Sequence, residues 1–285
     1  MTISVASGKG GTGKTTVAAS LVSVIPESVY IDCDVEEPNG HLLLKPNIIT
    51  EALAYKLIPE INYAGCNSCN KCLEVCEYNA LLNFKTEIFL LDTLCHSCGA
   101  CAYFCPQNAI TEIKKKIGVI RNGQVDDQIL FYDAYLKIGE ESATPLIKQL
   151  KNAYRGNRTV VVDSPPGTSC SMSEVVKDSD YCILVTESTP FGINDLKLAV
   201  NVLLQIGVPF GIVINKYDKT FTQLEEYIAL NNLNILLKIP FSIYVAESYS
   251  KGELPATVIK DYRQMMEELL EKIKREIVEA NANAG

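Results

Sequence analysis

The chain has 285 residues, 47% of them hydrophobic and 21% charged, so it can bury a sizeable core and is not disordered as a whole. Its 26 Lys and Arg against 34 Asp and Glu give a formal net charge of −8, which disfavours a nucleic-acid binder that neutralises phosphates over a broad surface. The apolar runs are far shorter than the roughly 20 residues that cross a bilayer. Ser7-Gly8-Lys9 also interrupts the apolar start of the chain where a signal peptide would continue. We therefore expect a cytoplasmic protein without a membrane partner.

Six short, apolar and partly β-branched segments alternate with helix-length segments along most of the chain. Continuous apolar strands that are spaced by helices are typical of a parallel sheet covered on both faces. The sequence therefore predicts an α/β fold with a mostly parallel sheet. The predicted strands are Thr2–Ala6, Ser28–Ile31, Thr159–Val162, Tyr181–Thr186, Val208–Ile214 and Asn234–Ile239.

Cysteines interrupt this pattern once, between roughly Pro59 and Lys116. Eight of the eleven cysteines lie between Cys66 and Cys105, in two runs of the form C-x2-C-x2-C-x3-C that are each followed by Asn-Ala. In a chain without an export signal, this spacing favours metal binding over disulfides. The α/β pattern resumes afterwards, so we predict one domain formed by residues 1–58 and 117–285, with a small domain of residues 59–116 inserted into it.

The last predicted helix, Val258–Ala280, has one apolar face and mixed charges elsewhere. A helix that lies on an anionic membrane has a predominantly basic polar face, whereas this one carries many glutamates. We expect it to pack on the sheet instead. Its apolar positions at helical spacing are Ile259, Tyr262, Met266, Leu269, Ile273 and Ile277.

A glycine-rich segment follows the first predicted strand and precedes a helix-compatible stretch. It fits the P-loop pattern, in which glycines let backbone N–H groups surround phosphate oxygens and the helix N-terminus adds positive potential. Lys14 is then expected to reach the outer phosphates, and Thr15 to supply a hydroxyl to Mg²⁺. The predicted nucleotide-binding residues of this segment are Gly8, Lys9, Gly10, Gly11, Thr12, Gly13, Lys14, Thr15 and Thr16.

With Lys9 as a second lysine, the segment resembles the deviant Walker A motif of the MinD, ParA, Mrp and nitrogenase iron protein superfamily of P-loop ATPases. The resemblance covers residues 1 to about 58 and about 117 to 285. It implies slow, partner-stimulated ATP hydrolysis in a face-to-face homodimer, in which Lys9 reaches the nucleotide of the other chain. The catalytic residues that it implies are Lys9, Lys14 and Asp34.

Acidic residues after two predicted strands match further motifs of this superfamily. Asp34 matches the first switch, where the carboxylate orients the attacking water, and Asp32 is expected near the magnesium. The segment from Val160 to Gly167 resembles a Walker B strand and the second switch, with Asp163 in the magnesium shell and Gly167 at the γ-phosphate. The placement is physically sensible, because open parallel sheets bind ligands at the carboxyl ends of their strands.

Two positions near the last predicted strands resemble the superfamily's base-binding region. Asn215 follows a buried strand and resembles the asparagine that reads adenine, although a plain turn residue is a serious alternative there. Pro240 lies at the next transition from strand to loop. We expect it to flank the base.

The two cysteine runs have the spacing of a bacterial two-cluster ferredoxin, in which the fourth cysteine of each run ligates the other cluster. Zinc is the alternative, but structural zinc sites commonly use two paired C-x-x-C hooks. The second run has the usual following proline, Pro106, whereas Glu77 follows the first, a departure that removes no ligand. The predicted ligands are Cys66, Cys69, Cys72 and Cys105 for one 4Fe-4S cluster, and Cys95, Cys98, Cys101 and Cys76 for the other.

Three cysteines lie outside this ligand set. Cys182 is expected in the core, and Cys33 is expected to point into the sheet. Cys170 follows the second switch, close to where the related nitrogenase iron protein holds its intersubunit cluster, and we favour packing over a redox or bridging-cluster role for it. For His96, inside the second run, we favour a solvated loop histidine over a hydrogen bond near the second cluster.

The whole chain resembles the ferredoxin-containing branch of the MinD/Mrp-type ATPases, also through the segment from Thr186 to Asp195. In one hypothesis, the clusters stay bound and ATP gates electron transfer to a redox partner protein. In the other, the protein assembles iron-sulfur or other metal clusters or carries them to an acceptor protein, and ATP hydrolysis times their release. Ligands shared between the two runs favour the first hypothesis, because they close both sites. Positional partitioning on DNA or membranes is disfavoured by the net charge.

Overall fold

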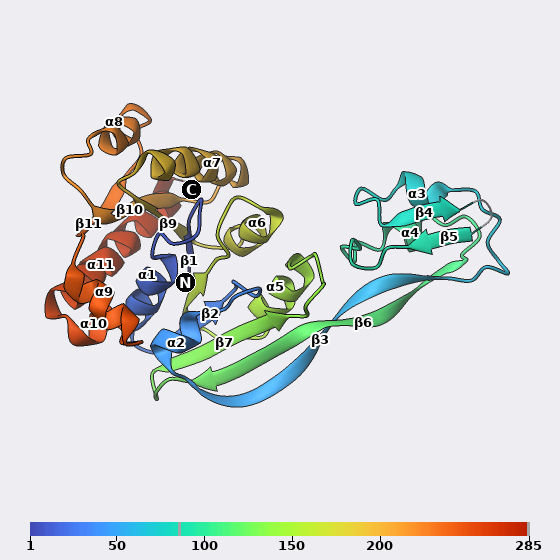
Figure 1. Cartoon of the computed structure of the whole chain (residues 1–285), viewed down its shortest axis with the longest axis horizontal. Coiled ribbons are helices and arrows are strands. Elements are labelled where there is room, and N and C mark those ends of the chain that lie inside the picture. Colours follow the sequence, from blue (N-terminus) through green and yellow to red (C-terminus); the bar gives the residue numbers. More distant parts are fainter. Residues whose placement is uncertain (85–86, 284–285) are drawn as a thin grey trace.

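The computed structural model describes residues 1–84 and 87–283, whose centre is one large twisted sheet (Figure 1). Within these residues the sheet has nine strands in the order β11-β10-β9-β1-β8-β2-β7-β6-β3. The strands from β11 to β7 run parallel, and β6 and β3 join them antiparallel. Their bounds are β1 Thr2–Ala6, β2 Ser28–Asp32, β3 Asn47–Ile61, β6 Ile110–Gln124, β7 Ile129–Leu136, β8 Thr159–Asp163, β9 Tyr181–Glu187, β10 Phe210–Tyr217 and β11 Ile235–Pro240.

Helices cover both faces of the parallel strands. Successive side chains of a strand point to opposite faces, so Ile3 and Val5 of β1 pack on one layer while Ala6 packs on the other. The first layer is formed by α1 Lys14–Val22, α2 Gly40–Leu44, α9 Ile243–Ser250, α10 Pro255–Val258 and α11 Lys260–Asn283. The second is formed by α5 Thr144–Lys151, α6 Cys170–Val176, α7 Pro190–Ile206 and α8 Gln223–Leu230.

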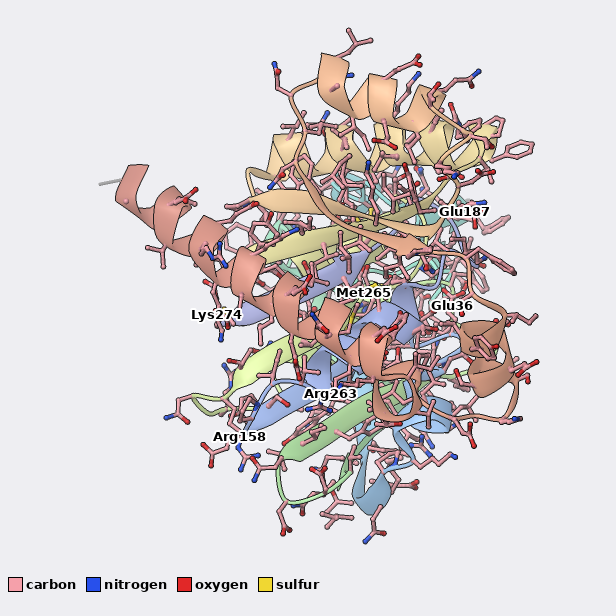
Figure 2. All side chains as sticks on the ribbon, turned by 90° about the vertical axis from the view of Figure 1, so that its left-hand side faces the viewer. Glu36, Arg158, Glu187, Arg263, Met265 and Lys274 are labelled. Atoms are coloured by element: carbon pink, nitrogen blue, oxygen red, sulfur yellow. The ribbon has the colours of Figure 1, made fainter. Side chains whose placement is uncertain are left out.

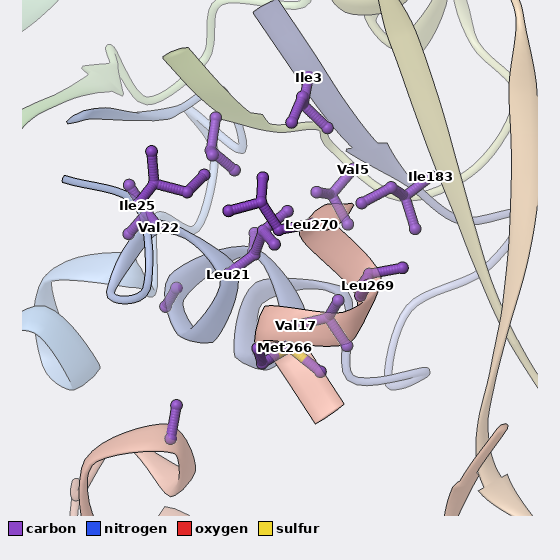
Figure 3. Packing of buried hydrophobic residues seen from close by; sticks show 14 of the residues in the cluster. Ile3, Val5, Val17, Leu21, Val22, Ile25, Ile183, Met266, Leu269 and Leu270 are labelled. Carbon is purple, nitrogen blue, oxygen red and sulfur yellow. The ribbon is translucent and has the colours of Figure 1, made fainter. Parts of the chain in front are cut away.

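The C-terminal helix α11 packs on the sheet and on α1, as the apolar pattern predicts. Met266 and Leu269 of α11 lie against Val17 and Leu21 of α1 in the buried cluster of Figure 3. The helix begins two residues later than predicted, because Ile259 has an extended backbone that separates α10 from α11. None of the helices in the described part of the chain is long and apolar enough to cross a membrane.

The strands β3 and β6 form a long hairpin that leads away from the helical layers and carries a small separate unit (Figure 1). We call the described residues 62–84 and 87–109 the distal unit. It contains α3 Lys71–Glu74, α4 Ala100–Tyr103 and a two-stranded sheet of β4 Leu81–Phe84 and β5 Glu87–Leu90. Its buried residues Cys72, Leu81 and Ile88 form a cluster of their own with Ile110 at the start of β6. The predicted boundaries at residues 58/59 and 116/117 fall inside the two hairpin strands.

The structure confirms the predicted α/β class and all six predicted strands, with small shifts in their bounds. The strand predicted from Val208 begins at Phe210, after Pro209, which has no N–H to donate to a neighbouring strand, and it continues to Tyr217. The sequence pattern did not predict β7, which pairs with β2, or the hairpin strands β3 and β6. The hairpin strands are half exposed and mix polar with apolar residues, so they lack the continuous apolar run of a buried parallel strand.

Replacing Leu269 by Ala should lower the free energy of unfolding by about 2–5 kcal/mol, because Leu269 is fully buried between α11, α1 and the sheet. Val278→Ala on the same helix is the control, since this side chain is 67% exposed, and it should change stability by no more than about 0.5 kcal/mol. Urea denaturation followed by circular dichroism measures both. Equal effects of the two substitutions would contradict the described packing of α11.

Candidate functional site

A cleft of about 520 Å³ opens at the carboxyl ends of the parallel strands. Figure 2 places Glu36 and Glu187, which follow β2 and end β9, on this side of the sheet, and Arg158, which precedes β8, on the opposite side. The loop between β1 and α1 forms the floor of the cleft. The predicted residues that line it are Lys9, Gly10, Gly11, Thr12, Gly13, Lys14, Thr15, Thr16, Asp34, Asn215 and Pro240.

Two glycines of the loop between β1 and α1 are required by its backbone. Gly13 is the N-cap of α1 and has φ +88°, a conformation that side chains rarely adopt, and a Cβ there would lie 2.2 Å from Nδ2 of Asn215. A Cβ on Gly8 would lie 2.2 Å from the backbone oxygen of Asp195 on α7. The loop is therefore held closely between β10 and α7, and its backbone ends at a helix N-terminus that can bind phosphate.

Lys14 is almost completely buried and forms an ion pair with the buried Asp163, the last residue of β8. Its Nζ lies 2.6 Å from Oδ1 of Asp163, while the hydroxyl of Tyr30 donates to Oδ2 at 3.0 Å. Burial alone lowers the pKa of Lys14, but the charge of Asp163 and the hydrogen bond to it raise this pKa above its usual value. Lys14 is therefore fully protonated at neutral pH and ready to meet an anion.

Asp32 and Asp163 lie side by side, because they are register partners at the ends of neighbouring strands β2 and β8. Asp32 accepts backbone N–H groups from Asp34 at 3.1 Å, Asn39 at 3.1 Å and Gly40 at 2.8 Å. Burial, together with the adjacent charge of Asp163, raises the pKa of Asp32 to about 8. Two acidic groups this close favour a cation beside them, and carboxylate oxygens together with the hydroxyl of Thr15 suit Mg²⁺.

Asp34 is half-buried and faces the same cleft as Lys14. Burial raises its pKa to about 6, and the charge of Lys14 opposes this rise. The described geometry therefore brings together the three carboxylates that the sequence placed here. Gly167 has φ +90°, and its N–H donates to the backbone oxygen of Ser7 at 3.0 Å, which joins the segment after β8 to the end of β1.

Lys9 reaches toward β9 within its own chain, where it forms an ion pair with Glu187. Lys216 also lies 3.3 Å from Glu187 and donates to the backbone oxygen of Gly11 at 3.0 Å. Burial raises the pKa of Glu187, but hydrogen bonds from the two lysines outweigh it and lower this pKa overall. The two lysines and Glu187 thus fasten the glycine-rich loop to the ends of β9 and β10.

Asn215 lies within β10 and not in a loop after it, and its side chain has partners on both sides. Its Nδ2 donates to the backbone oxygen of Thr12 at 2.7 Å, and its Oδ1 accepts from the N–H of Lys216 at 2.9 Å. Pro240 ends β11 at the apolar end of the cleft, next to the 67% exposed Phe241. The role of Asn215 and Pro240 at an adenine base remains a prediction.

The eight cysteines of the two runs line two small hollows in the distal unit. One hollow is lined by three cysteines of the first run and the last of the second, namely Cys66, Cys69, Cys72 and Cys105. The other is lined by Cys95, Cys98 and Cys101 of the second run and by Cys76 of the first. We call them the first-run site and the second-run site. One cysteine of each set, Cys69 or Cys98, is exposed at the surface.

Within the described residues, no three His, Cys, Asp or Glu side chains gather closely enough to hold one metal ion. Each hollow is nevertheless lined by four cysteine thiols, and thiolates are the ligands that a 4Fe-4S cluster uses. The donor set therefore fits the group that the sequence predicts.

The remaining predictions for cysteines and histidines have mixed outcomes. Cys33 and Cys182 are completely buried in the core beside α5, α6 and α7, as expected. Cys170 begins α6 and is exposed, so a packing role is wrong for it in this chain. His96 is not a freely solvated residue, because its ring stacks on Tyr78 at 3.7 Å between centroids.

Two residues at this site escaped the sequence analysis. Tyr30 holds Asp163 from the middle of β2, and Glu187 holds Lys9 from the end of β9. Tyr30 could have been recognised from the sequence, because it lies inside a predicted buried strand and a buried tyrosine hydroxyl needs a hydrogen-bond partner. Glu187 ends an apolar strand on the side where such sheets bind ligands, which is the same signal that marked Asp163.

Comparison with known proteins places this fold and site in a known group. Residues 3–256 match the model of the CobQ/CobB/MinD/ParA nucleotide binding domain. The chain is 33% identical to the uncharacterized protein MJ0578 of Methanocaldococcus jannaschii, over 96% of both chains. Its fold is similar to the cell division ATPase MinD of Pyrococcus furiosus, with TM-score 0.57, 17% identity and coverage of 96% and 98%. The MinD protein of Pyrococcus horikoshii in complex with Mg-ADP gives TM-score 0.56, 18% identity and 96% coverage of both chains.

Gly13→Ala should weaken ATP binding at least tenfold, because the methyl group collides with Asn215 and the backbone angle is strained, so the loop must move. Gly65→Ala is the control, since its Cβ would meet ordinary contacts near 3.7 Å in the distal unit. Titration calorimetry measures the affinity, and melting temperatures check that both variants fold. An unchanged affinity in folded Gly13→Ala would mean that ATP does not bind over this loop.

Proposed function

The chain belongs to the CobQ/CobB/MinD/ParA nucleotide-binding family, and on this premise we propose that it is a Mg²⁺-dependent ATPase that couples ATP binding and hydrolysis in a homodimer to electron transfer through two 4Fe-4S clusters. The observation that carries the proposal is the pair of cysteine-lined hollows, each completed by the fourth cysteine of the other run, at the end of a hairpin that grows out of the nucleotide-binding fold. The electron acceptor would be a partner protein.

The cleft contains the groups that phosphoryl transfer to water requires. Backbone N–H groups at the start of α1 would face the phosphates, and Lys14 would add a positive charge that its ion pair with Asp163 keeps in place. Asp34 lines the same cleft and would orient the attacking water. Bound Mg²⁺ would neutralise charge on the phosphate oxygens, and Thr15, Asp32 and Asp163 are the residues that would hold it.

The shared ligands favour electron transfer over delivery of clusters. Each hollow draws cysteines from both runs, so releasing a cluster from one site also opens the ligand set of the other run. The exposed Cys69 and Cys98 bring both sites to the surface, where electrons can pass to a partner without loss of a ligand. When bound, the clusters would supply one-electron redox chemistry that no side chain of this chain provides.

The position of the hairpin supports coupling between the two chemistries. The strand β7 lies between β2, which leads to Asp34, and β6, which leads to the distal unit. A rearrangement at the end of β2 on ATP binding therefore has a short path of paired strands to the cysteines. If ATP binding changes the equilibrium constant for cluster reduction by some factor, thermodynamic linkage requires that cluster reduction changes the ATP affinity by the same factor.

Anaerobically purified or reconstituted protein should contain about eight irons per chain, as two clusters of four. Cys69→Ser and Cys98→Ser should each disturb one cluster and leave the spectrum of the other, because each residue lines only one hollow. Iron and sulfide analysis with electron paramagnetic resonance checks this. Stable zinc in place of iron after anaerobic reconstitution would refute the iron-sulfur assignment.

Hydrolysis should require two chains if Lys9 acts on the partner's nucleotide. Lys9→Ala and Asp34→Asn should each be inactive alone, whereas a mixture should regain activity, because one site of the mixed dimer then takes Asp34 from one chain and Lys9 from the other. Phosphate release measured across mixing ratios checks this. Full activity of Lys9→Ala, or a strictly monomeric ATP-bound protein, would contradict the dimer model.

Iron retention during turnover separates electron transfer from cluster delivery. The protein with its clusters is incubated anaerobically with MgATP and a chelator that cannot reach bound clusters, and iron that leaves the chain is counted per ATP hydrolysed. Retention of the eight irons through many turnovers, with nucleotide-dependent oxidation by an artificial acceptor, supports the proposal. Iron loss in proportion to hydrolysis would establish the carrier function instead.

A further inference from the structure

The loop around Cys95 is attached to the ATPase fold by a buried ion pair. Lys56 lies on β3 and is only 2% exposed, and its ammonium forms an ion pair with the buried carboxylate of Glu140, in the segment that follows β7. The same ammonium donates to the backbone oxygen of Cys95 at 2.8 Å. Three parts of the chain that are distant in sequence therefore meet at one charged group.

Further contacts hold the same loop. The N–H of Leu57 donates to Oγ of Ser97 at 2.8 Å, and Oγ of Ser142 lies 3.4 Å from Nδ1 of His96. His96 in turn stacks on Tyr78, which also lines the second-run site. The loop from Cys95 to Ser97 is thus fixed at each of its residues by β3, by the segment after β7 or by the distal unit.

The first run has a different environment. Asn70, which precedes α3, accepts a hydrogen bond from Asn83, and Lys71 forms an exposed ion pair with Glu74 at 2.9 Å. All four residues belong to the distal unit. These exposed charges are screened by water, whereas Lys56 and Glu140 are not. Among the described residues, these contacts of the first run stay within the distal unit, whereas those of the Cys95 loop reach β3 and the segment after β7.

The segment that carries Glu140 begins at the nucleotide site. The N–H of Leu136, at the end of β7, donates to the backbone oxygen of Val35 at 2.8 Å, and Val35 follows Asp34 directly. Lys137 then donates to Ile117 on β6 at 2.8 Å, and Glu140 donates its N–H to Lys137 at 3.0 Å. Consecutive hydrogen bonds therefore connect the segment from Leu136 to Glu140 with Val35 beside the nucleotide site.

We propose that Lys56 and Glu140 are positioning residues that tie the second-run site, and not the first-run site, to the ATPase fold. The inference rests on the proposed function, because it requires that the two sites hold 4Fe-4S clusters. An electron added at the second-run site is stabilised by the nearby ammonium of Lys56 and destabilised by the carboxylate of Glu140. The charges are buried, so their effects on reduction are strong and opposite in sign.

The test measures both midpoint potentials in an anaerobic redox titration of the full chain. Lys56→Met should lower one of the two midpoint potentials by at least 59 mV, which corresponds to a tenfold change in the equilibrium constant for a one-electron reduction. Glu140→Gln should raise the same potential. Lys114→Met is the matched control, because this lysine lies on β6 next to Lys115 and is exposed. It should move neither potential by that amount. Cys98→Ser assigns the shifted signal to the second-run site.

Lys56→Met leaves Glu140 without its main partner, so a third variant guards against misfolding. The double substitution Lys56→Met with Glu140→Met removes both charges and leaves no unpaired buried ion, so it should fold. In it, the difference between the ATP-bound and ADP-bound potentials of the second-run site should disappear, while the two potentials remain measurable. A persistent nucleotide-dependent difference of unchanged size would overturn the proposal. Equal shifts of both potentials, or shifts in the same direction for Lys56→Met and Glu140→Gln, would also overturn it.

Hydrogen exchange of the iron-free chain separates this inference from the proposed function. If the unmodified protein binds no iron, the proposed function and the redox part of the inference both fail. Amides of residues 95–98 should nevertheless exchange at least tenfold faster in Lys56→Met than in the unmodified chain, with residues 66–70 unchanged. If iron is bound but exchange and potentials are unaffected by Lys56→Met, only the further inference fails.

Discussion

The buried ion pair between Lys14 and Asp163 connects the nucleotide loop to the centre of the sheet. Asp163 ends β8, which lies between β1 and β2, so the pair forms only when these three strands are in register. Removing one member of such a buried pair costs about 3–5 kcal/mol, because a charge is left without a partner. The floor of the cleft and the arrangement of the central strands therefore depend on each other.

Tyr30 and Asp32 extend this constraint across β2. Tyr30 points to the α1 side of the sheet and reaches Asp163 with its hydroxyl, while its ring stacks on Phe131 of β7 at 5.7 Å. Asp32 uses its carboxylate to order the segment up to Gly40. The residues that would hold Mg²⁺ thus also hold the backbone that carries Asp34. The same loop contacts β7, because the N–H of Leu136 donates to the backbone oxygen of Val35.

Lys9 and Glu187 show how the single chain differs from the dimer implied by the family resemblance. In the single chain Lys9 is bound to Glu187 at the rim of the cleft. Reaching the nucleotide of a partner requires that this ion pair opens, and Lys216 is then left as the other lysine beside Glu187. The side chain of Lys9 is 29% exposed and that of Glu187 only 13%, so Lys216 must then balance the more buried carboxylate.

Local pattern in the sequence determined the parts of this protein that depend on short-range geometry. The glycine-rich loop, the apolar parallel strands, the amphipathic α11 and the two cysteine runs each follow from spacing within a short segment. Only the tertiary structure decided which distant residues meet: Tyr30 with Asp163, Lys9 with Glu187, and Lys56 with both Glu140 and Cys95. These partners lie between 39 and 178 residues apart, and their pairing depends on strand order and register, which no local periodicity encodes. The hairpin of β3 and β6 escaped prediction for the same reason, because its half-exposed strands are stabilised by each other and not by a continuous apolar run.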